Sequence, residues 1–435
     1  MRIPEILLIE SQHKPGSLAK VLQVIGEAGI VVENLNAVRR HQDRTVWELT
    51  VEMDEGADRG LYDKINALDN AKIIGKSDRV FDRHKGGKIA TVSKVKLDSV
   101  QRLRDVYTPG VARVSLAIQQ DPSKAWDYTS LGNTVGIITN GTAVLGLGDI
   151  GALAGLPVME GKAMIYAEFA GISGIPILLK DKNPTKIIQA VLAIEQSFGA
   201  IHLEDIGAPE CFEIEEELIR HLKKPVLHDD QHGTAVVTLA GLISATKRVK
   251  RDLKSCTVGQ IGLGAAGIGI VRLLYQYGVK AVLGADRRDE ALMRLEKMGG
   301  KRASLDELMQ KADIVIATTG VKGLIKPESV RKGQVIFALS NPEPEITARA
   351  ALEAGAAYAT DGRSVNNALG YPALFRGALD ARARRFTDAM LFAAATKLAE
   401  LSPPEELLPD PLDARVHAEV ALAVKEAAIA SGACK

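Results

Sequence analysis

The stretch VLHDDQHGTAVV places two neighbouring carboxylates, Asp229 and Asp230, between two histidines. His228 and His232 have the HxxxH spacing that would put two imidazoles on one helical face, as a zinc site requires. The preceding PVL and the following Gly233 favour a junction between a strand and a helix instead, and no third nitrogen or sulfur ligand is evident. Acidic residues at such a junction also cap helices. A metal site, a catalytic pair and a capping turn are therefore the three interpretations of this stretch.

A second acidic pair, Glu204 and Asp205 in AIHLEDIG, also follows a short apolar run that is typical of a strand. Two carboxylate pairs at strand ends would form an oxygen-rich site suited to Mg²⁺ or Mn²⁺. Either pair alone is explained as well by the capping of turns and helix starts. In a chain that also carries a nucleotide motif, the two pairs together favour a divalent-metal site over zinc.

The segment TVGQIGLGAAGIGIVRLLYQYG contains Gly262, Gly264 and Gly267 as GxGxxG, between an apolar strand and an apolar helix. The first glycine permits a tight turn, the second lets the backbone approach a pyrophosphate, and the third brings helix and strand together. The helix N-terminus attracts the negative charge of the phosphates. Asp286 ends the next strand, about 20 residues further on, where it would bond the ribose hydroxyls. This pattern predicts a dinucleotide-binding site.

The preference for one dinucleotide depends on the side chains near Asp286. Its carboxylate would repel a 2′-phosphate, but Arg287 and Arg288 follow directly and could receive that phosphate. The choice between NAD and NADP stays open, with NAD favoured. Two later strand ends, DIVIATTG and QVIFALSNPEPE, place Thr318 and Asn341 at the carboxyl edge of the same sheet, where cofactors bind.

The composition excludes several kinds of partner. The 435 residues include 55 Lys and Arg against 54 Asp and Glu, with only 4% aromatics, so nothing directs the chain to nucleic acid or an anionic membrane. No apolar run is long enough to cross a bilayer or to form a signal-peptide core. Three widely spaced cysteines form neither a disulfide framework nor a CxxC motif. We expect a cytoplasmic protein.

Residues 1–83 are predicted to form a small separate unit. Strand-like composition occurs in PEILLIESQ, IVVENLNAV, TVWELTVEM and AKIIGKSDRVF, and helical spacing in PGSLAKVLQVIGEAG and Leu61–Leu68. The resulting β-α-β-β-α-β order is the ferredoxin-like pattern. With the turn HKPGSLA after its first strand, the unit resembles the small regulatory ACT domain, which implies a small effector. The alternative is a unit that only mediates dimer contacts.

Beyond a basic, glycine-containing linker at Asp82–Lys94, strands alternate with helical runs, as expected for α/β layers. We predict a catalytic α/β domain over residues 84–232. We also predict a Rossmann domain with C-terminal helices over residues 233–435. The end of the chain is expected to be helical, with a proline-rich break at SPPEELLPDP.

An ordered set of motifs from Val106 to Pro372 closely resembles the malic enzyme family in its shorter bacterial form. The motifs are VYTPGVA, LGLGDIGALAGLPVMEGK, HLEDIGAPE, LHDDQHGTAVV, IGLGAAG, ALSNP and VNNALGYP. The resemblance covers about residues 90 to 400, and most members lack the ACT-like segment. It implies an enzyme that oxidises malate to pyruvate and CO₂ with NAD(P)⁺ and Mg²⁺ or Mn²⁺. It also implies a homodimer or a higher homo-oligomer.

The resemblance further implies roles for single residues, which on residue type alone would be packing or surface positions. They are Glu204, Asp205 and Asp230 as metal ligands with Asp229 as their supporting catalytic partner, Tyr107 as general acid, Lys162 as general base, and Asn341 and Asn367 as substrate contacts.

A lysine can remove the C2 hydroxyl proton of malate only when it is neutral. We therefore expect the metal, partial burial and the N-terminal end of its helix to lower the pKa of Lys162. The ion would stabilise the enolate formed when the C4 carboxylate is lost, and Tyr107 would protonate C3. Larger family members carry an arginine before GLGD that pairs with a substrate carboxylate, whereas this chain has Ala143. Anchoring is then left to Asn367, backbone N–H groups or another arginine.

Two other functions fit parts of the sequence. A metal-free 2-hydroxyacid dehydrogenase with an ACT domain would need a catalytic histidine after the nucleotide domain, and only His417 is available there. An ACT-based amino-acid-binding regulator on an inactive scaffold would have lost its catalytic residues, yet Tyr107, Lys162 and the acidic ligands are all present. A metal-dependent malic enzyme is the favoured prediction.

Overall fold

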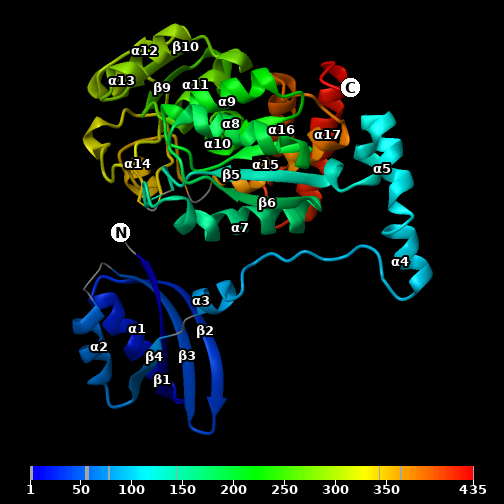
Figure 1. The fold of residues 1–435 in the computed structure, drawn as a ribbon. Coiled ribbons are helices and arrows are strands. Elements are labelled where there is room, and N and C mark those ends of the chain that lie inside the picture. The colour runs from blue at the N-terminus through cyan, green and yellow to red at the C-terminus, as the bar shows by residue number, and fades with distance from the viewer. Residues whose placement is uncertain are drawn as a thin grey trace. The chain divides into compact units, whose positions relative to one another are not determined.

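The computed structural model describes residues 3–53, 58–76, 79–144, 146–341, 343–362 and 365–434. The chain divides into two compact units, Met1–Lys88 and Ile89–Lys435 (Figure 1). Among the described residues, no helix has both the length and the apolar character that a membrane span needs. The larger unit contains every residue that the sequence assigns to a metal, a substrate or a nucleotide.

The N-terminal unit is a four-stranded antiparallel sheet with two helices packed on one face. Its elements are β1 (Ile3–Gln12), α1 (Ser17–Glu27), β2 (Val31–His41), β3 (Arg44–Met53), α2 (Asp58–Asn66), β4 (Ala71–Lys76) and α3 (Arg79–His84). Hydrogen bonds join the strands in the order β2-β3-β1-β4. Side chains alternate between the faces of a strand, so Leu7 and Ile9 of β1 both reach the core that Val21 and Ile25 of α1 complete.

The end of this unit differs from the sequence prediction. We expected one strand over AKIIGKSDRVF, but β4 ends at Lys76 and Arg79–His84 form the helix α3. Ser77 and Asp78 lie outside the described residues. The Arg79 guanidinium bonds the Glu48 carboxylate of β3 at 2.7 Å, which ties the start of α3 to the sheet.

The larger unit begins with three helices, α4 (Val100–Val106), α5 (Val111–Gln120) and α6 (Ala125–Tyr128). All residues of α4 and α5 are described, and none of them is buried. In Figure 1 these two helices, in cyan, stand beside the layered part of the unit rather than within it. Both are therefore amphipathic or apolar helices without a covering layer in the single chain.

A parallel four-stranded sheet follows, with the order β6-β5-β7-β8. It is formed by β5 (Thr134–Thr139), β6 (Ser173–Leu178), β7 (Ala200–Leu203) and β8 (Val226–His228), with the helices α7 (Ala152–Ala170), α8 (Pro184–Ile194) and α9 (Glu210–His221). Every residue of β5 and β7 is buried, as expected for central strands of a parallel sheet covered on both faces. The carboxyl ends of β7 and β8 consequently lie next to each other.

A second parallel sheet has the order β11-β10-β9-β12-β13-β14. Its strands are β9 (Thr257–Ile261), β10 (Ala281–Ala285), β11 (Lys301–Arg302), β12 (Ile314–Ala317), β13 (Val335–Ala338) and β14 (Tyr358–Asp361), and its helices are α11 (Ala265–Tyr277), α12 (Asp289–Lys297), α13 (Leu305–Lys311) and α14 (Ala348–Glu353). The strand order reverses between β9 and β12, which is where doubly wound sheets bind their ligands.

The long helix α10 (Asp229–Arg248) joins the two sheets and is buried along most of its length. It starts directly after β8, so it crosses the expected domain boundary between residues 232 and 233 without a break. The C-terminal segment forms three helices, α15 (Tyr371–Asp380), α16 (Asp388–Leu401) and α17 (Ala414–Ala430). Short 3₁₀ turns complete the unit: η1 (Pro122–Lys124), η2 (Leu131–Asn133), η3 (Glu195–Ser197), η4 (Leu253–Ser255), η5 (Pro327–Ser329) and η6 (Asn367–Leu369).

Candidate active site

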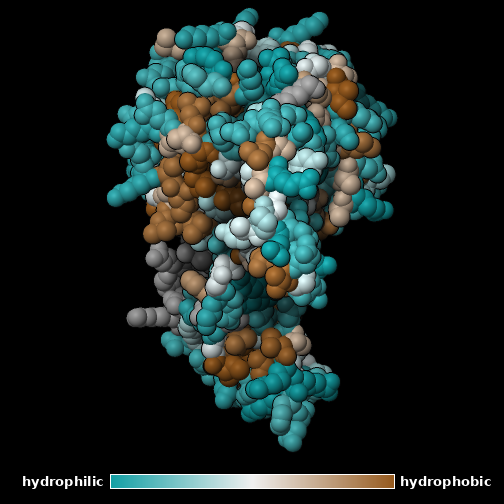
Figure 2. Space-filling view, turned by 45° about the vertical axis from the view of Figure 1, so that its right-hand side comes forward, coloured by the Kyte–Doolittle hydropathy of each residue, from teal (hydrophilic) through white to brown (hydrophobic). Residues whose placement is uncertain are grey.

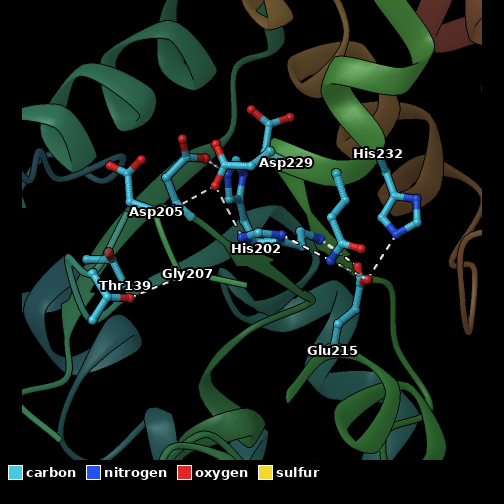
Figure 3. Close-up of polar contacts among 12 residues, drawn as sticks. Thr139, His202, Asp205, Gly207, Glu215, Asp229 and His232 are labelled. Atoms are coloured by element: carbon cyan, nitrogen blue, oxygen red, sulfur yellow. Dashed lines mark hydrogen bonds and ion pairs between the residues drawn. The ribbon is translucent and has the colours of Figure 1, made fainter. Parts of the chain in front are cut away.

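Both acidic pairs meet at one edge of the first sheet. Glu204 and Asp205 follow β7, while Asp229 and Asp230 open α10 directly after β8. The two strands are neighbours in parallel register, with Leu203 beside His228, so the residues that follow emerge side by side. Figure 3 shows Asp205 and Asp229 on the same side of this edge. The fold thus brings together four carboxylates that the sequence separates.

Three of these carboxylates have the geometry and chemistry of a divalent-metal site. Oxygens of Glu204, Asp205 and Asp230 lie within 4.8 Å of one another. Asp205 Oδ2 is buried and has no hydrogen-bond partner among the described residues. Burial, together with the neighbouring carboxylates, raises the pKa of Glu204 to about 7 and that of Asp205 to about 9. A bound cation would offset the free-energy cost of ionising these buried, neighbouring carboxylates. An all-oxygen donor set fits Mg²⁺ or Mn²⁺.

The backbone of Asp205 is held in an unusual conformation. Its φ of 53° lies in the left-handed region, which costs free energy for a residue other than glycine. Its N–H donates to Asp230 Oδ2 at 2.9 Å, so the strained turn also fixes the neighbouring carboxylate. This strain sits at the carboxylate group, as is common for functional residues.

Lys162 contacts two of the four carboxylates. Its Nζ lies 2.5 Å from Asp229 Oδ2 and 3.1 Å from Glu204 Oε1, and 4.5 Å from the centre of the Tyr371 ring. Burial lowers the pKa of Lys162, but the charges of Asp229 and Glu204 outweigh burial and hold that pKa well above its usual value. Lys162 is the eleventh residue of α7, so the expected contribution of a helix N-terminus is wrong.

Asp229 contacts a second predicted site residue besides the lysine. Its Oδ2 also accepts a bond from Asn367 Nδ2 at 2.7 Å, which brings the predicted substrate contact from η6 into the same cluster. Asp229 Oδ1 is buried without a partner among the described residues. A Cβ on Gly233 would lie 1.8 Å from that oxygen, so a larger residue there would force the Asp229 carboxylate to move.

The two histidines of HDDQH have separate partners. His228 Nε2 lies 3.2 Å from Asp230 Oδ2, whereas His232 Nε2 lies 2.9 Å from Glu215 Oε2 of α9 (Figure 3). The Glu215 carboxylate also accepts the backbone N–H of His228 at 2.7 Å and the Gln231 amide at 3.1 Å. Among the described residues, no metal-sized cluster contains both histidines. The motif is a strand-to-helix junction that fixes the acidic pair, as its flanking residues predicted.

The glycines of the nucleotide motif have distinct mechanical roles. Gly262 has a φ of 85°, which favours glycine. A Cβ on Gly267 would lie 2.0 Å from the Gly262 carbonyl oxygen, so helix and strand could not approach as they do. A Cβ on Gly264, the N-cap of α11, would meet nothing closer than 3.9 Å. That open space above a helix N-terminus fits a pyrophosphate.

The other side chains that were predicted to contact the nucleotide lie around this loop or at neighbouring strand ends. Asp286 accepts the Leu263 N–H at 2.7 Å, and the Arg288 guanidinium lies 3.2 Å from the same carboxylate. Thr318 Oγ1 donates to the Gly262 carbonyl at 3.2 Å. Asn341 follows β13, and its amide would be 2.6 Å from a Cβ on Gly362. The structure places these residues at the carboxyl edge of the second sheet.

Glu345 also belongs to the nucleotide edge, although the sequence analysis did not identify it. This buried carboxylate accepts bonds from the N–H and hydroxyl of Thr319, both at 2.7 Å, and from the Ser340 hydroxyl at 2.5 Å. It therefore joins the loops after β12 and β13. The acidic repeat PEPE in the sequence was the available signal.

No contact among the described residues joins Tyr107, the predicted general acid, to the carboxylates of its own chain. The tyrosine caps the C-terminus of α4, its side chain is 66% exposed, and its hydroxyl has no partner among the described residues. Ala143, in contrast, lies beside the metal cluster, where its N–H donates to the Asp205 carbonyl at 3.1 Å.

Buried aromatic residues behind Lys162 were also missed. Tyr166 lies one turn after Lys162 on α7, Tyr371 donates its hydroxyl to the Lys162 carbonyl at 3.2 Å, and His202 bonds both Tyr166 and Glu204. His202 and Tyr371 stand inside the motifs HLEDIG and NNALGYP, which was the only available signal. Their partners come from other elements, so spacing along the chain could not reveal them.

Comparison with known proteins decides the family. The chain is 50% identical to NAD-dependent malic enzyme 1 of Bacillus subtilis (strain 168), over 97% of each chain. Family models of the malic enzyme N-terminal domain and NAD-binding domain match residues 86–187 and 286–429. The chain belongs to the malic enzyme family. A relative from Geobacillus stearothermophilus, an NAD-dependent malic enzyme, is 41% identical over 96% of this chain and 93% of its own.

Solved malic enzyme structures share the fold of the larger unit. The malic enzyme of Pyrococcus horikoshii Ot3 has a TM-score of 0.77 at 40% identity, covering 82% of this chain and 92% of its own. The NAD-dependent malic enzyme of Thermotoga maritima has a TM-score of 0.75 at 40% identity, covering 80% and 99%. The model of the NAD-binding domain of D-isomer specific 2-hydroxyacid dehydrogenases matches residues 223–325. That match falls on the dinucleotide fold, which both families use.

Proposed function

We propose that this protein catalyses the oxidative decarboxylation of (S)-malate to pyruvate and CO₂, with reduction of NAD(P)⁺ and with Mg²⁺ or Mn²⁺. The observation that carries the proposal is the position of Lys162 Nζ, 2.5 Å from Asp229 and 3.1 Å from Glu204, at the edge of the three-carboxylate cluster. A potential base beside a metal cluster, in a unit that also holds a dinucleotide fold, is what hydroxyacid oxidation requires.

Each residue of the site has a defined task in this reaction. Glu204, Asp205 and Asp230 would hold the ion, and Lys162 would take the proton from the C2 hydroxyl of malate. When bound, a divalent ion would weaken the attraction of these carboxylates for the lysine proton and stabilise negative charge on the substrate oxygens. The nicotinamide would accept the C2 hydride. Asp229 orients the lysine, and Asn367 is held by Asp229 at a position where its remaining amide atoms can meet a substrate carboxylate.

The proton at C3 is supplied by Tyr107 in this proposal, and Tyr107 reaches the site from a second copy of the chain. The tyrosine is 66% exposed at the end of α4, and α4 and α5 contain no buried residue. Tyr107 of the partner subunit would then act on the Lys162 site of the first. A homodimer is thus part of the catalytic proposal.

Exposed apolar side chains support this dimer. They lie on α4 and α5 at Val100, Leu103, Val106, Val111, Val114 and Leu116, and on α7 and β6 at Leu153, Val158, Met164 and Ile175. Figure 2 shows apolar residues, in brown, gathered at the surface of the larger unit. Exposed apolar residues gathered in this way are typical of a protein interface. A two-fold dimer is the commonest way to cover them.

The nucleotide site favours NAD. Asp286 stands at the ribose position with a pKa below its usual value, because its bonds to Arg288 and to the Leu263 N–H outweigh burial. The carboxylate is thus ionised and repels a 2′-phosphate. Arg288 is exposed and can turn toward that phosphate, so NADP is a slower alternative rather than an excluded one.

The N-terminal unit is assigned here as an ACT-like regulatory domain. Its element order, its strand order β2-β3-β1-β4 and the turn at Gly16, with a φ of 83° before α1, support this assignment. The test is the malate assay with a panel of amino acids. A change in kcat or KM supports an effector role, and unchanged kinetics with every amino acid favours the dimer-contact role instead.

The experiment that tests the main proposal is a spectrophotometric assay of the full chain with L-malate and Mn²⁺. NAD⁺ and NADP⁺ are supplied in parallel, with a chelator control and with pyruvate measured independently. We expect metal-dependent reduction of NAD⁺, slower reduction of NADP⁺, and one pyruvate per NADH. Reduction without pyruvate would indicate a simple dehydrogenase, and reduction that survives the chelator would remove the metal from the mechanism.

A further inference from the structure

A buried chain of two hydrogen bonds ends at the metal cluster. The Tyr166 hydroxyl of α7 lies 2.7 Å from His202 Nδ1 on β7, and His202 Nε2 lies 2.5 Å from Glu204 Oε2. Tyr166 and His202 are 0% exposed and Glu204 is 3% exposed. Figure 3 shows His202 below the carboxylates, with its ring directed toward them. Because these groups are almost fully buried, breaking either hydrogen bond would leave polar atoms without a partner.

The direction of both bonds follows from the number of protons. Burial raises the pKa of Tyr166 well above its usual value, so the hydroxyl keeps its proton. The hydroxyl has His202 as its hydrogen-bond partner among the described residues, and a buried hydroxyl that donated to nothing would be costly. His202 Nδ1 therefore accepts. Once Nδ1 accepts, the other ring nitrogen, Nε2, carries the N–H, which donates to Glu204 Oε2 at 2.5 Å.

This tautomer decides between two roles for His202. A second possible cluster contains His202, Glu204 and Asp229, in which the imidazole itself would be a ligand. A protonated Nε2 has no lone pair to offer an ion, so the imidazole cannot be a ligand through this nitrogen. His202 therefore acts on Glu204 and does not bind the ion.

The ring of His202 is fixed by aromatic neighbours as well as by its bonds. It stacks on Phe375 at 5.4 Å between centroids with 16° between the planes, and meets the edges of Tyr166 and Tyr371 at 5.7 and 5.4 Å. With Lys162 on Oε1 and His202 on Oε2, both oxygens of Glu204 have a fixed direction. The remaining lone pairs of Glu204 are then directed to the cluster with Asp205 and Asp230.

We propose that Tyr166 and His202 are positioning residues that orient Glu204 for the divalent ion. Outer partners of this type set the direction and basicity of metal ligands, and their loss typically weakens metal binding by about 10- to 100-fold. The inference rests on the proposed metal-dependent function. It assigns a role to a histidine and a tyrosine that would otherwise be satisfied core residues.

The test is Mn²⁺ binding to the full chain without substrate, followed by the EPR signal of free Mn²⁺. Tyr166→Phe removes only the hydroxyl and keeps the aromatic packing, so we expect Mn²⁺ to bind about 10-fold more weakly. Tyr275→Phe is the matched control, because Tyr275 is a half-buried tyrosine of α11 outside the site. His202→Leu should weaken binding more than Tyr166→Phe, and His202→Gln, which keeps an N–H donor, should recover part of the loss.

Kinetics give an independent readout. In Tyr166→Phe the Mn²⁺ concentration for half-maximal malate oxidation should rise, while kcat at saturating Mn²⁺ stays near that of the unmodified chain and NADH binding is unchanged. The proposal is overturned if Tyr166→Phe and His202→Gln bind Mn²⁺ as the unmodified chain does and only melt at a lower temperature. Tighter binding in Tyr166→Phe would also overturn it, in favour of His202 as a ligand. Failure of the unmodified chain to form pyruvate, despite Mn²⁺ binding, would instead refute the proposed function.

Discussion

Lys162 is the proposed base for the C2 hydroxyl of malate, and it lies between two carboxylates in a buried site. We expect Lys162→Met, which keeps the length of the side chain, to lower kcat for malate oxidation by about 10²- to 10⁴-fold, the usual contribution of a general base. NADH binding, measured by fluorescence, should not change, because the lysine lies outside the nucleotide loop.

Lys162→Arg provides the control for this substitution. It keeps the positive charge between Asp229 and Glu204 but cannot become a neutral base near neutral pH. Loss of activity in both variants supports a base. Activity retained in the arginine variant would mean that the lysine only neutralises its carboxylate neighbours.

Asp205 gives the metal-free protein an unusual dependence on pH. The folded protein holds the Asp205 proton up to about pH 9, whereas the unfolded chain releases it near pH 4. Between pH 7 and 9 the folded state therefore binds more protons, and its free energy of unfolding falls as the pH rises, by roughly 2 kcal/mol. Urea unfolding in EDTA at pH 7 and pH 9 measures this difference.

Asp205→Asn should remove most of that decrease, since an amide does not titrate and asparagine tolerates the left-handed backbone at this position. Added Mn²⁺ should stabilise the unmodified chain more at pH 9 than at pH 7, because the ion binds the ionised carboxylates. If the free energy of unfolding of the asparagine variant falls between pH 7 and pH 9 by as much as that of the unmodified chain, other groups cause the pH dependence.

At the level of single residues, the sequence indicated candidate groups for the chemistry, but it did not indicate the residues that position those groups. The residue types in the motifs of Glu204, Asp229 and Asp230 predict metal chemistry. The role of Lys162 was implied only by the resemblance to the malic enzyme family. His202 stands in the same motif as Glu204, but its role depends on Tyr166, which is 36 residues away. The pKa of Lys162 was expected to be lowered because the sequence did not reveal that Asp229 contacts it directly.

The first turn of α11 offers a test of how an element forms the nucleotide site. Gly267→Ala places a Cβ 2.0 Å from the Gly262 carbonyl, where only backbone can move, so α11 must shift away from β9. We expect a loss of about 1 to 3 kcal/mol or more in the free energy of unfolding. Thermal unfolding without nucleotide measures this effect.

Gly264→Ala is the contrasting variant in the same loop. A Cβ there meets nothing closer than 3.9 Å in the protein, so stability should be nearly unchanged. The methyl group would occupy the space assigned to the pyrophosphate, and NADH should bind about 10-fold more weakly or worse. Normal NADH affinity in Gly264→Ala would place the dinucleotide elsewhere.

Elements were predictable where composition and periodicity agree. The strand and helix of the glycine motif and the helix α1 follow the sequence prediction. A strand-to-helix junction was also predicted for HDDQH, and α10 begins there at Asp229. The segment after β4 was expected to continue as a strand, because alternation in AKIIGK was extended over residues that form α3. The long C-terminal helical run is two helices, α15 and α16, because the turn between them depends on tertiary contacts.

For the whole molecule, the central question is how Tyr107 joins a site that a single chain leaves without it. α4 and α5 expose apolar side chains along their length, and a second copy of the chain is the partner that the proposed function assigns to them. If Tyr107 acts in the partner's site, each active site contains residues of both subunits. Dissociation of the dimer should then abolish activity before the subunits unfold.

Mixed dimers of two inactive variants distinguish a shared site from a site within one chain. Tyr107→Phe lacks the acid and Lys162→Met lacks the base, so each homodimer should be almost inactive in pyruvate formation. When the two are co-expressed, half of the dimers are mixed, and each mixed dimer pairs one intact Lys162 with one intact Tyr107 across the interface. Activity should then return to about a quarter of the unmodified level if the tyrosine acts across a two-fold interface. If Tyr107 acts within its own chain, neither site of a mixed dimer is complete, and the mixture stays as inactive as its parents.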